Sequence, residues 1–287
     1  MNHVVRAGEA AVEPFALEIT PKSAGWGYSG LRILELSAGQ GETLDTDDSE
    51  CIVLSLTGSA DVGVDDTTYA LEGRDHVFAG PSDAVYVPRD SALSITSARG
   101  GRFALASSRC DVKLQPTYLA KADVPVEMRG AGQSSRQVNN FGIPGVLEAD
   151  RLIACEVLTP GGNWSSWPPH KHDEEREGET ALEEIYHFEV ADGPAGAGMA
   201  YQRVYGHEGA DIDVTTEIRS GDSVLIPHGW HGPSIAAPGY DLYYLNVMAG
   251  PGAERAWLIC DDPAHSWVRD TWADQPIDPR LPFGGAS

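Results

Sequence analysis

Short runs of β-branched and aromatic residues, separated by glycine and proline, recur along the whole chain and limit what it can fold into. Typical runs lie at residues 51–56, 84–88, 223–227 and 241–247, with turn residues roughly every eight to twelve positions. Strands at that spacing are typical of an all-β sandwich or barrel. Stretches with the apolar period of an amphipathic helix are scarce. We therefore expect an all-β fold with few and short helices.

The strand pattern occurs twice. The run at 49–58 leads on to 80–88, and the run at 182–190 leads on to 221–227. In each half the second run consists of an acidic turn followed by an apolar strand that ends at a proline. We expect two tandem antiparallel β-barrels, spanning residues 1–125 and 126–287, because strand-breaking prolines stand near the join at 115–130. A single large β-domain is the alternative.

Charge and apolar run length exclude several classes of protein. The 287 residues include 43 acidic and 20 basic side chains, a formal net charge of −23. Such a chain repels phosphate backbones, so we expect no nucleic-acid partner. The longest apolar runs are far shorter than the ~20 residues that cross a bilayer, and the start MNHVVRAGEA has no signal pattern. We expect no membrane partner and a cytoplasmic protein.

Two other features predict no special chemistry. The cysteines are far apart and form no CxxC pair, so neither a thiolate zinc site nor a disulfide framework is indicated. They are Cys51, Cys110, Cys155 and Cys260. The acidic stretch at 173–180 is expected to be a solvated loop.

Histidines in the second half are spaced as metal ligands. His170 and His172 stand two residues apart, so on a strand both imidazoles face the same side and Lys171 points away. The next strand, 182–190, alternates so that Glu184 lies on its apolar, inward face. A buried carboxylate needs a partner, and a metal ion held by the two histidines would be one.

A third histidine, His231, follows the apolar strand that ends at Pro227. Three imidazoles and one carboxylate form a ligand set that suits a divalent ion such as Zn²⁺, Mn²⁺ or Fe²⁺. The arrangement resembles the cupin pattern, in which Gly221, Pro227, Gly229 and His231 match the second motif. The gap between His172 and Glu184 is longer than usual for cupins and indicates an insertion. A role for His228 stays open.

The first half lacks this set. Where its two histidines would fall, near residues 41–47, there is none, and Glu50 is the one carboxylate that survives. We expect a first barrel without metal ligands that serves as scaffold, interface or wall.

Longer stretches resemble the 5-deoxy-glucuronate isomerases of myo-inositol catabolism, which are related to 5-keto-4-deoxyuronate isomerases. The resemblance is close over about residues 125–270 and lies in the segments 129–136, 168–173, 182–186, 201–205 and 238–251. One departure is Pro227-His-Gly-Trp-His231, where the family usually has Arg and Tyr at positions 228 and 230.

The resemblance implies a bicupin of two jelly-roll barrels with one divalent metal ion, usually zinc, in the second barrel. It also implies an aldose–ketose isomerisation of 5-deoxy-glucuronate, a small anionic sugar acid, to 2-deoxy-5-keto-gluconate. Metal-chelated substrate oxygens acidify the neighbouring C–H bond, and a positioned group then moves the proton. Bicupin faces commonly pair, so we expect a homo-oligomer.

The sequence also offers candidates for the catalytic and substrate-binding roles. Tyr186 shares a face with Glu184, and either Tyr243 or Tyr244 points inward; we take Tyr186 and Tyr244 as the catalytic candidates. Gln202 and Arg203 lie in one strand, and Arg203 could bind the substrate carboxylate bidentately or form a structural ion pair. Arg136 is a weaker candidate for the same role.

Two other functions use the same residues. Three histidines and a glutamate with iron, copper or nickel also occur in cupin dioxygenases, and spacing alone does not separate them from an isomerase. A non-enzymatic sugar-binding or storage cupin is the second alternative, although storage members often lose the ligands.

Overall fold

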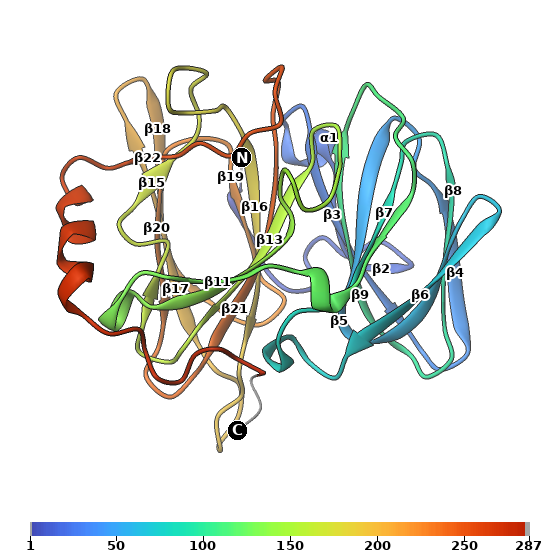
Figure 1. Cartoon of the computed structure of the whole chain (residues 1–287), viewed down its shortest axis with the longest axis horizontal. Coiled ribbons are helices and arrows are strands. Elements are labelled where there is room, and N and C mark those ends of the chain that lie inside the picture. Colours follow the sequence, from blue (N-terminus) through green and yellow to red (C-terminus); the bar gives the residue numbers. More distant parts are fainter. Residues whose placement is uncertain (1, 285–287) are drawn as a thin grey trace.

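The computed structural model describes residues 2–284 and consists almost entirely of antiparallel strands, which form two barrels side by side (Figure 1). The first barrel is one nine-stranded sheet. Its strands are β2 (Phe15–Ile19), β3 (Ser29–Leu36), β4 (Gln40–Asp45), β5 (Ser49–Val64), β6 (Thr67–Arg74), β7 (Ala84–Val87), β8 (Ala92–Ser97), β9 (Gly101–Arg109) and β10 (Thr117–Leu119).

The long strand β5 closes the first barrel. Its beginning pairs with β7 and β9, its end pairs with β6 and β8, and its register with β9 shifts between Ser55 and Thr57. Gly58, at φ 85°, follows the shift; a Cβ there would lie 2.5 Å from the carbonyl oxygen of Gly100. A bend at glycine therefore lets one strand serve two faces of the barrel.

The second barrel consists of two sheets packed face to face. The larger has the order β1 (Val4–Val5), β19 (Ser223–Ile226), β16 (Glu183–Val190), β21 (Leu242–Ala249), β13 (Ile153–Thr159), β12 (Arg136–Gly142), β11 (Val126–Arg129). The smaller has the order β18 (Ala210–Ile218), β17 (Ala200–His207), β20 (Trp230–Ala236), β15 (His170–Lys171), β22 (Cys260–Asp261), with β14 (Trp164–Ser165) paired to β20.

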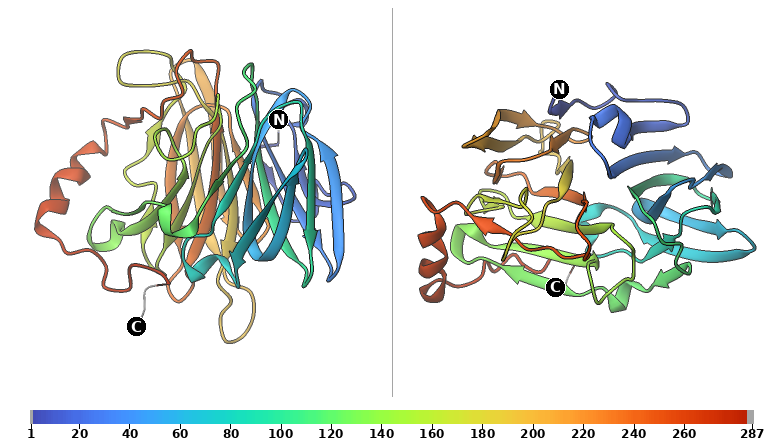
Figure 2. Two further views of the ribbon diagram at one scale, coloured as in Figure 1. Left: turned by 45° about the vertical axis from the view of Figure 1, so that its right-hand side comes forward. Right: turned by 90° about the horizontal axis from the view of Figure 1, so that it is seen from above.

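The predicted all-β class is confirmed, and the four strand runs expected from the sequence lie in β5, β7, β19 and β21. Helices are few and short in the described chain: α1 (Pro21–Ala24), η1 (Val77–Ala79), η2 (Lys121–Asp123), η3 (Gly132–Ser134) and η4 (Ser266–Asp274). The last lies on the outer side of the second barrel (Figure 2). Among residues 2–284, none of the helices has the length and apolar character that a bilayer crossing requires.

Three apolar cores result from the alternation of side chains along the strands. One fills the first barrel and includes Val53 and Phe103; another fills the second barrel and includes Phe188 and Tyr244. A third core joins the barrels, because the outer face of the larger sheet packs on the first barrel through residues such as Ile185. Strands of the larger sheet are therefore covered on both faces.

The chain start does not follow the expected division at residue 125. Strand β1 pairs with β19 of the second barrel, so residues 4–5 extend its larger sheet. Arg6 holds the chain start on the second barrel, because its guanidinium forms an ion pair with Asp222 at 2.7 Å and donates a hydrogen bond to the carbonyl of Glu217. Further along, β10 pairs within the first barrel and β11 pairs within the second.

Candidate metal centre

Both sheets of the second barrel contribute side chains to one buried cluster. His170 of β15 is paired with His231 of β20 in the smaller sheet, and Glu184 projects inward from β16 of the larger sheet. His172 follows β15 directly. The ring nitrogens of the three histidines lie within 4.8 Å of one another, and all four side chains are buried. The structure thus brings together every metal ligand expected from the sequence.

Hydrogen bonds orient two of the imidazoles towards the centre of the cluster. Nδ1 of His172 lies 3.3 Å from the carbonyl oxygen of Leu182, and Nδ1 of His231 lies 3.1 Å from that of Gly229. A carbonyl only accepts, so each Nδ1 carries the proton and each Nε2 presents a lone pair. Backbone partners of this kind commonly fix the tautomer of metal-binding histidines.

The donor set fits a metal ion. Oε2 of Glu184 lies 3.1 Å from Nε2 of His172 and 3.1 Å from Nε2 of His231, and the latter nitrogen is fully buried without a hydrogen-bond partner. Lone pairs and a carboxylate oxygen at such distances repel one another unless a cation lies among them. The three histidines and Glu184 could therefore hold a divalent ion.

The ionisation of His170 and Glu184 is shifted in the direction that metal binding needs, whereas the contact with Glu184 outweighs burial and raises the pKa of His172 above its ordinary value. Burial and the neighbouring rings of His231 and His172 hold the pKa of His170 well below its ordinary value. Burial alone would raise the pKa of Glu184, yet the adjacent imidazoles of His172 and His231 lower it below its ordinary value. A neutral imidazole and an ionised carboxylate are the forms that bind metal.

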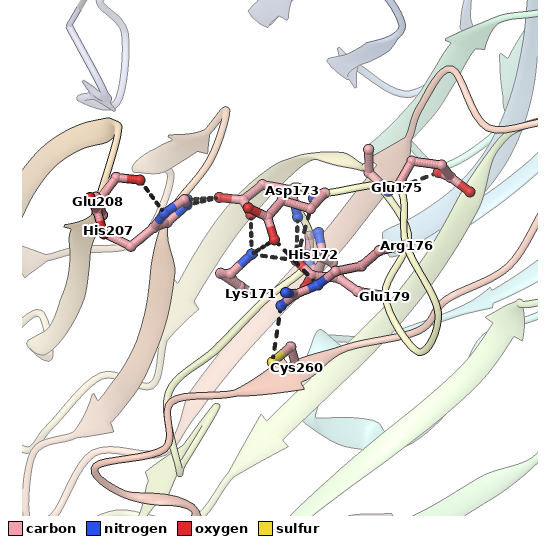
Figure 3. Close-up of polar contacts among 12 residues, drawn as sticks. Lys171, His172, Asp173, Glu175, Arg176, Glu179, His207, Glu208 and Cys260 are labelled. Carbon is pink, nitrogen blue, oxygen red and sulfur yellow. Dashed lines mark hydrogen bonds and ion pairs between the residues drawn. The ribbon is translucent and has the colours of Figure 1, made fainter.

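A buried ionic cluster behind the ligands was not expected. Lys171 points away from the metal ligands, as predicted, and its ammonium group bonds Asp173 at 2.6 Å and Glu179 at 2.7 Å (Figure 3). Asp173 also accepts hydrogen bonds from His207 at 2.8 Å and from the backbone N–H of Gly229 at 2.7 Å. The acidic stretch at 173–180 is therefore not solvated throughout, because Glu179 is only 1% exposed.

The two candidate tyrosines meet beside the metal ligands. Tyr186 and Tyr244 stack with ring centroids 4.8 Å apart, and the ring of Tyr186 lies 6.0 Å from that of His231. Tyr243 points the other way, into the core between the barrels. Burial raises the pKa of both Tyr186 and Tyr244, so both phenols stay protonated at neutral pH.

Two cavities with shared lining residues lie beside the cluster. A small cavity of about 40 Å³ lies against His170 and the two tyrosines, and a larger one of about 420 Å³ lies outside it. Five residues line both cavities: Arg129, Arg136, Trp257, Ile259 and Arg269. The outer cavity has the size of a small-molecule site, whereas the inner one holds little more than a water molecule.

One of these arginines has no acidic partner. Arg129 pairs with Glu127 at 2.9 Å, and Arg269 forms two bonds to Asp261. Arg136 is buried and bonds the carbonyl oxygen of Ser134 at 3.1 Å, and no ion pair in the described chain includes it. Burial lowers its pKa to about 10, so the guanidinium is still charged at neutral pH.

The other two substrate-binding candidates lie elsewhere. Arg203 is on the outer face of β17, where its guanidinium pairs with Asp213 and lies 5.2 Å from the ring of Tyr205. The structure thus favours the ion-pair alternative for Arg203. Gln202 is buried on the inner face of β17 and accepts a hydrogen bond from Ser234.

Several residues that line the cavities were missed by sequence reasoning. Arg129 is the cross-strand neighbour of Arg136, a pairing that the hairpin at 126–142 could have indicated. Ser166, Asn246 and Arg269 showed no recognisable pattern in the sequence; they come from the loop after β14, from β21 and from η4, which lie far apart along the chain. His228 lies outside the cluster and contacts the carbonyl of Asp211 at 3.2 Å.

Fold and site together define a bicupin with a candidate metal centre in its second barrel. Among solved structures, an oxalate decarboxylase from Lactobacillus farciminis shares this fold, with a TM-score of 0.65 and 13% identity over 91% of this chain and 88% of that one. Residues 3–268 match the KduI/IolB family. The chain belongs to that family, and it is an isomerase.

More similar relatives agree over nearly the whole chain. The 5-deoxy-glucuronate isomerases of Geobacillus kaustophilus and Bacillus subtilis are 38% and 37% identical, over 89% and 88% of this chain and 91% of each relative. An IolB-like protein from Salmonella typhimurium has a solved structure with a TM-score of 0.84. It is 32% identical over 93% of this chain and 99% of that one.

Proposed function

We propose that this chain isomerises 5-deoxy-glucuronate to 2-deoxy-5-keto-gluconate, an aldose–ketose conversion in myo-inositol degradation. The observation that carries the proposal is a pair of cavities that share the buried Arg136, which has no acidic partner, and of which the inner one reaches His170 of the histidine–glutamate cluster. Relatives whose names state this substrate support it. A sugar acid has both groups that such a cavity would bind, a carboxylate and adjacent carbonyl and hydroxyl oxygens.

The chemistry requires one divalent ion, and His170, His172, Glu184 and His231 would hold it. Zinc suits three imidazoles and a carboxylate, and Mn²⁺ or Fe²⁺ are also compatible with them. When bound, such an ion would polarise the substrate carbonyl and stabilise the negative charge that develops when the neighbouring C–H bond breaks.

Arg136 is the residue we propose for the substrate carboxylate. A guanidinium in a water-poor cavity gains most from a bidentate carboxylate when no protein acid competes for it. Arg129 and Arg269 already pair with Glu127 and Asp261, so they add little net positive charge. One free cation suits a substrate with one carboxylate, within a chain whose overall charge of −23 repels anions elsewhere.

Tyr186 and Tyr244 are the groups we propose for proton transfer at the substrate oxygens. Both line the inner cavity next to His170. Because burial raises their pKa values, they are hydrogen-bond donors to the substrate and not resting tyrosinate bases. General acid–base groups must lie within hydrogen-bond reach of the proton they move, and both phenols border the space next to His170.

The direct test is to incubate the purified chain with 5-deoxy-glucuronate under argon and follow the carbon-bound protons by NMR in deuterated water. We expect conversion at the aerobic rate, with deuterium next to the new carbonyl. Loss of turnover without oxygen would contradict the isomerase assignment for this substrate. The variant His231→Ala, measured with His228→Ala as control, should lose both metal content and turnover, and turnover by metal-free protein would contradict the ligand assignment.

A further inference from the structure

The hydroxyl of Ser166 lies between the two tyrosines. Its Oγ is 3.0 Å from the phenol oxygen of Tyr186 and 3.1 Å from that of Tyr244, and either partner in each contact can donate. All three side chains line the inner cavity next to His170. The hydroxyls therefore form a continuous chain of three, buried beside the proposed metal ligands, in which each oxygen is able to donate or accept.

The backbone at Ser166 is strained to place the hydroxyl there. Its φ is 47°, in the left-handed region that serine seldom adopts. Gly232 of β20 packs directly against it: a Cβ at position 232 would lie 1.8 Å from the carbonyl oxygen of Ser166. Such conformations persist only where the surroundings enforce them, and they concentrate at functional sites.

We propose that Ser166 joins Tyr186 and Tyr244 into a proton relay that carries the oxygen-bound proton from one substrate oxygen to the other. The inference rests on the proposed isomerisation, which moves two hydrogens. One passes from the hydroxyl-bearing carbon to the carbonyl carbon, and the other passes from the hydroxyl oxygen to the carbonyl oxygen. The relay moves the second.

The transfer balances at every oxygen. One phenol accepts the proton of the substrate hydroxyl and gives its own proton to Ser166. Ser166 gives its proton to the other phenol, which protonates the substrate carbonyl oxygen. Each O–H bond that breaks is replaced, no charge accumulates on the protein, and rotation of the three hydroxyls restores the starting direction.

Two substitutions separate the hydroxyl from the backbone strain. Ser166→Ala removes the hydroxyl and keeps a Cβ in the strained conformation, whereas Ser166→Gly removes the hydroxyl and relieves the strain. The control is Ser97→Ala, a buried serine of the first barrel whose hydroxyl bonds the carbonyl of Ser59. Each variant is assayed with 5-deoxy-glucuronate for kcat, KM, metal content and the solvent deuterium isotope effect on kcat.

We expect both Ser166 variants to keep their metal and a KM within twofold of the wild type, with kcat lowered by about 10²-fold. The wild-type isotope effect should depend on the deuterium fraction in a curved manner, because several protons move together, and this curvature should be lost without the hydroxyl. Ser166→Gly folds without strain, so wild-type kcat in that variant would overturn the relay alone. No conversion by the wild type would overturn the proposed function and the relay together.

Discussion

Glu50 and Glu183 stand at the beginning of matching strands in the two barrels, and each carboxylate accepts three backbone N–H bonds from the opposite barrel. Glu50 of β5 caps residues 150–152 at 2.7–2.8 Å, and Glu183 of β16 caps residues 27–29 at 2.6–3.0 Å. The two matching glutamates of the internal repeat thus hold the barrels together, because each binds the backbone of the other barrel.

This relationship corrects the interpretation of Glu50 as a remnant of the ligand set. Glu50 matches Glu183, and the position that matches the candidate ligand Glu184 is Cys51, which lies in the core of the first barrel. Because neighbouring residues of a strand face opposite sides, a register difference of one residue separates the two roles. Burial also raises the pKa of Cys51 to about 12, so its thiol stays protonated.

Removing either carboxylate should destabilise the protein. Glu50→Ala removes a fully buried carboxylate and leaves three backbone donors without that partner, and we expect the free energy of unfolding to fall by about 3–5 kcal/mol. Glu183→Ala should cost less, because Glu183 is only partly buried. Urea unfolding measures both, with the exposed Glu254→Ala as control. Equal values for Glu50→Ala and Glu254→Ala would show that the contacts of Glu50 contribute no stability.

Alternation along strands made the cluster of candidate metal ligands predictable, whereas cross-strand partners could not be read from the sequence. His170, Glu184 and His231 follow from residue spacing, because each projects from a strand whose inward face the sequence shows. The sequence favours Arg203 over Arg136 because Arg203 has no acid next to it along its own strand; its partner Asp213 lies on β18 and is brought near only by the β17–β18 pairing. The sequence likewise cannot show that Arg136 lacks an acidic partner, because that depends on which side chains line the folded cavity.

The ionic cluster behind the ligands should tune metal affinity. Asp173 links Lys171 to the backbone N–H of Gly229, whose carbonyl orients His231. Asp173→Asn weakens the contacts with Lys171 and with the backbone of Gly229, and we expect the affinity for Zn²⁺ to fall about 10–100-fold. Competition with a chromophoric chelator measures the affinity. Asp213→Asn, which breaks an exposed ion pair of the same barrel, is the control, and an equal loss in both variants would show that Asp173 does not act through the ligands.

We expect Arg136 to lower the stability of the fold and to strengthen substrate binding. Arg136→Met removes a buried charge that has no acidic partner, so we expect the free energy of unfolding to rise by about 1–2 kcal/mol. The same change should lower kcat/KM by about 10²–10³-fold, because the substrate carboxylate loses a bidentate partner. Arg203→Met should leave kcat/KM within twofold. A larger loss in Arg203→Met than in Arg136→Met would return the carboxylate site to the outer face of β17.

His187 gives the fold a predictable dependence on pH. It lies on the opposite face of β16 from Glu184, between the barrels, with Nδ1 3.0 Å from the hydroxyl of Ser223. Burial, with the positive charge of Arg102, lowers its pKa to about 3. The ordinary value is 6.5, so between pH 6.5 and pH 3 the unfolded chain binds a proton there that the folded chain does not.

Stability should therefore be fully present above pH 6.5 and decline as the pH falls towards 3. Between pH 7 and pH 4 the His187 contribution amounts to about 3 kcal/mol. Urea unfolding at both pH values, with chelator present throughout, should show a smaller decline for His187→Gln than for the wild type by about that amount. Glutamine keeps a hydrogen bond to Ser223 but does not titrate. The exposed His76→Gln should follow the wild type, and a parallel decline in all three proteins would assign the acid sensitivity to other groups.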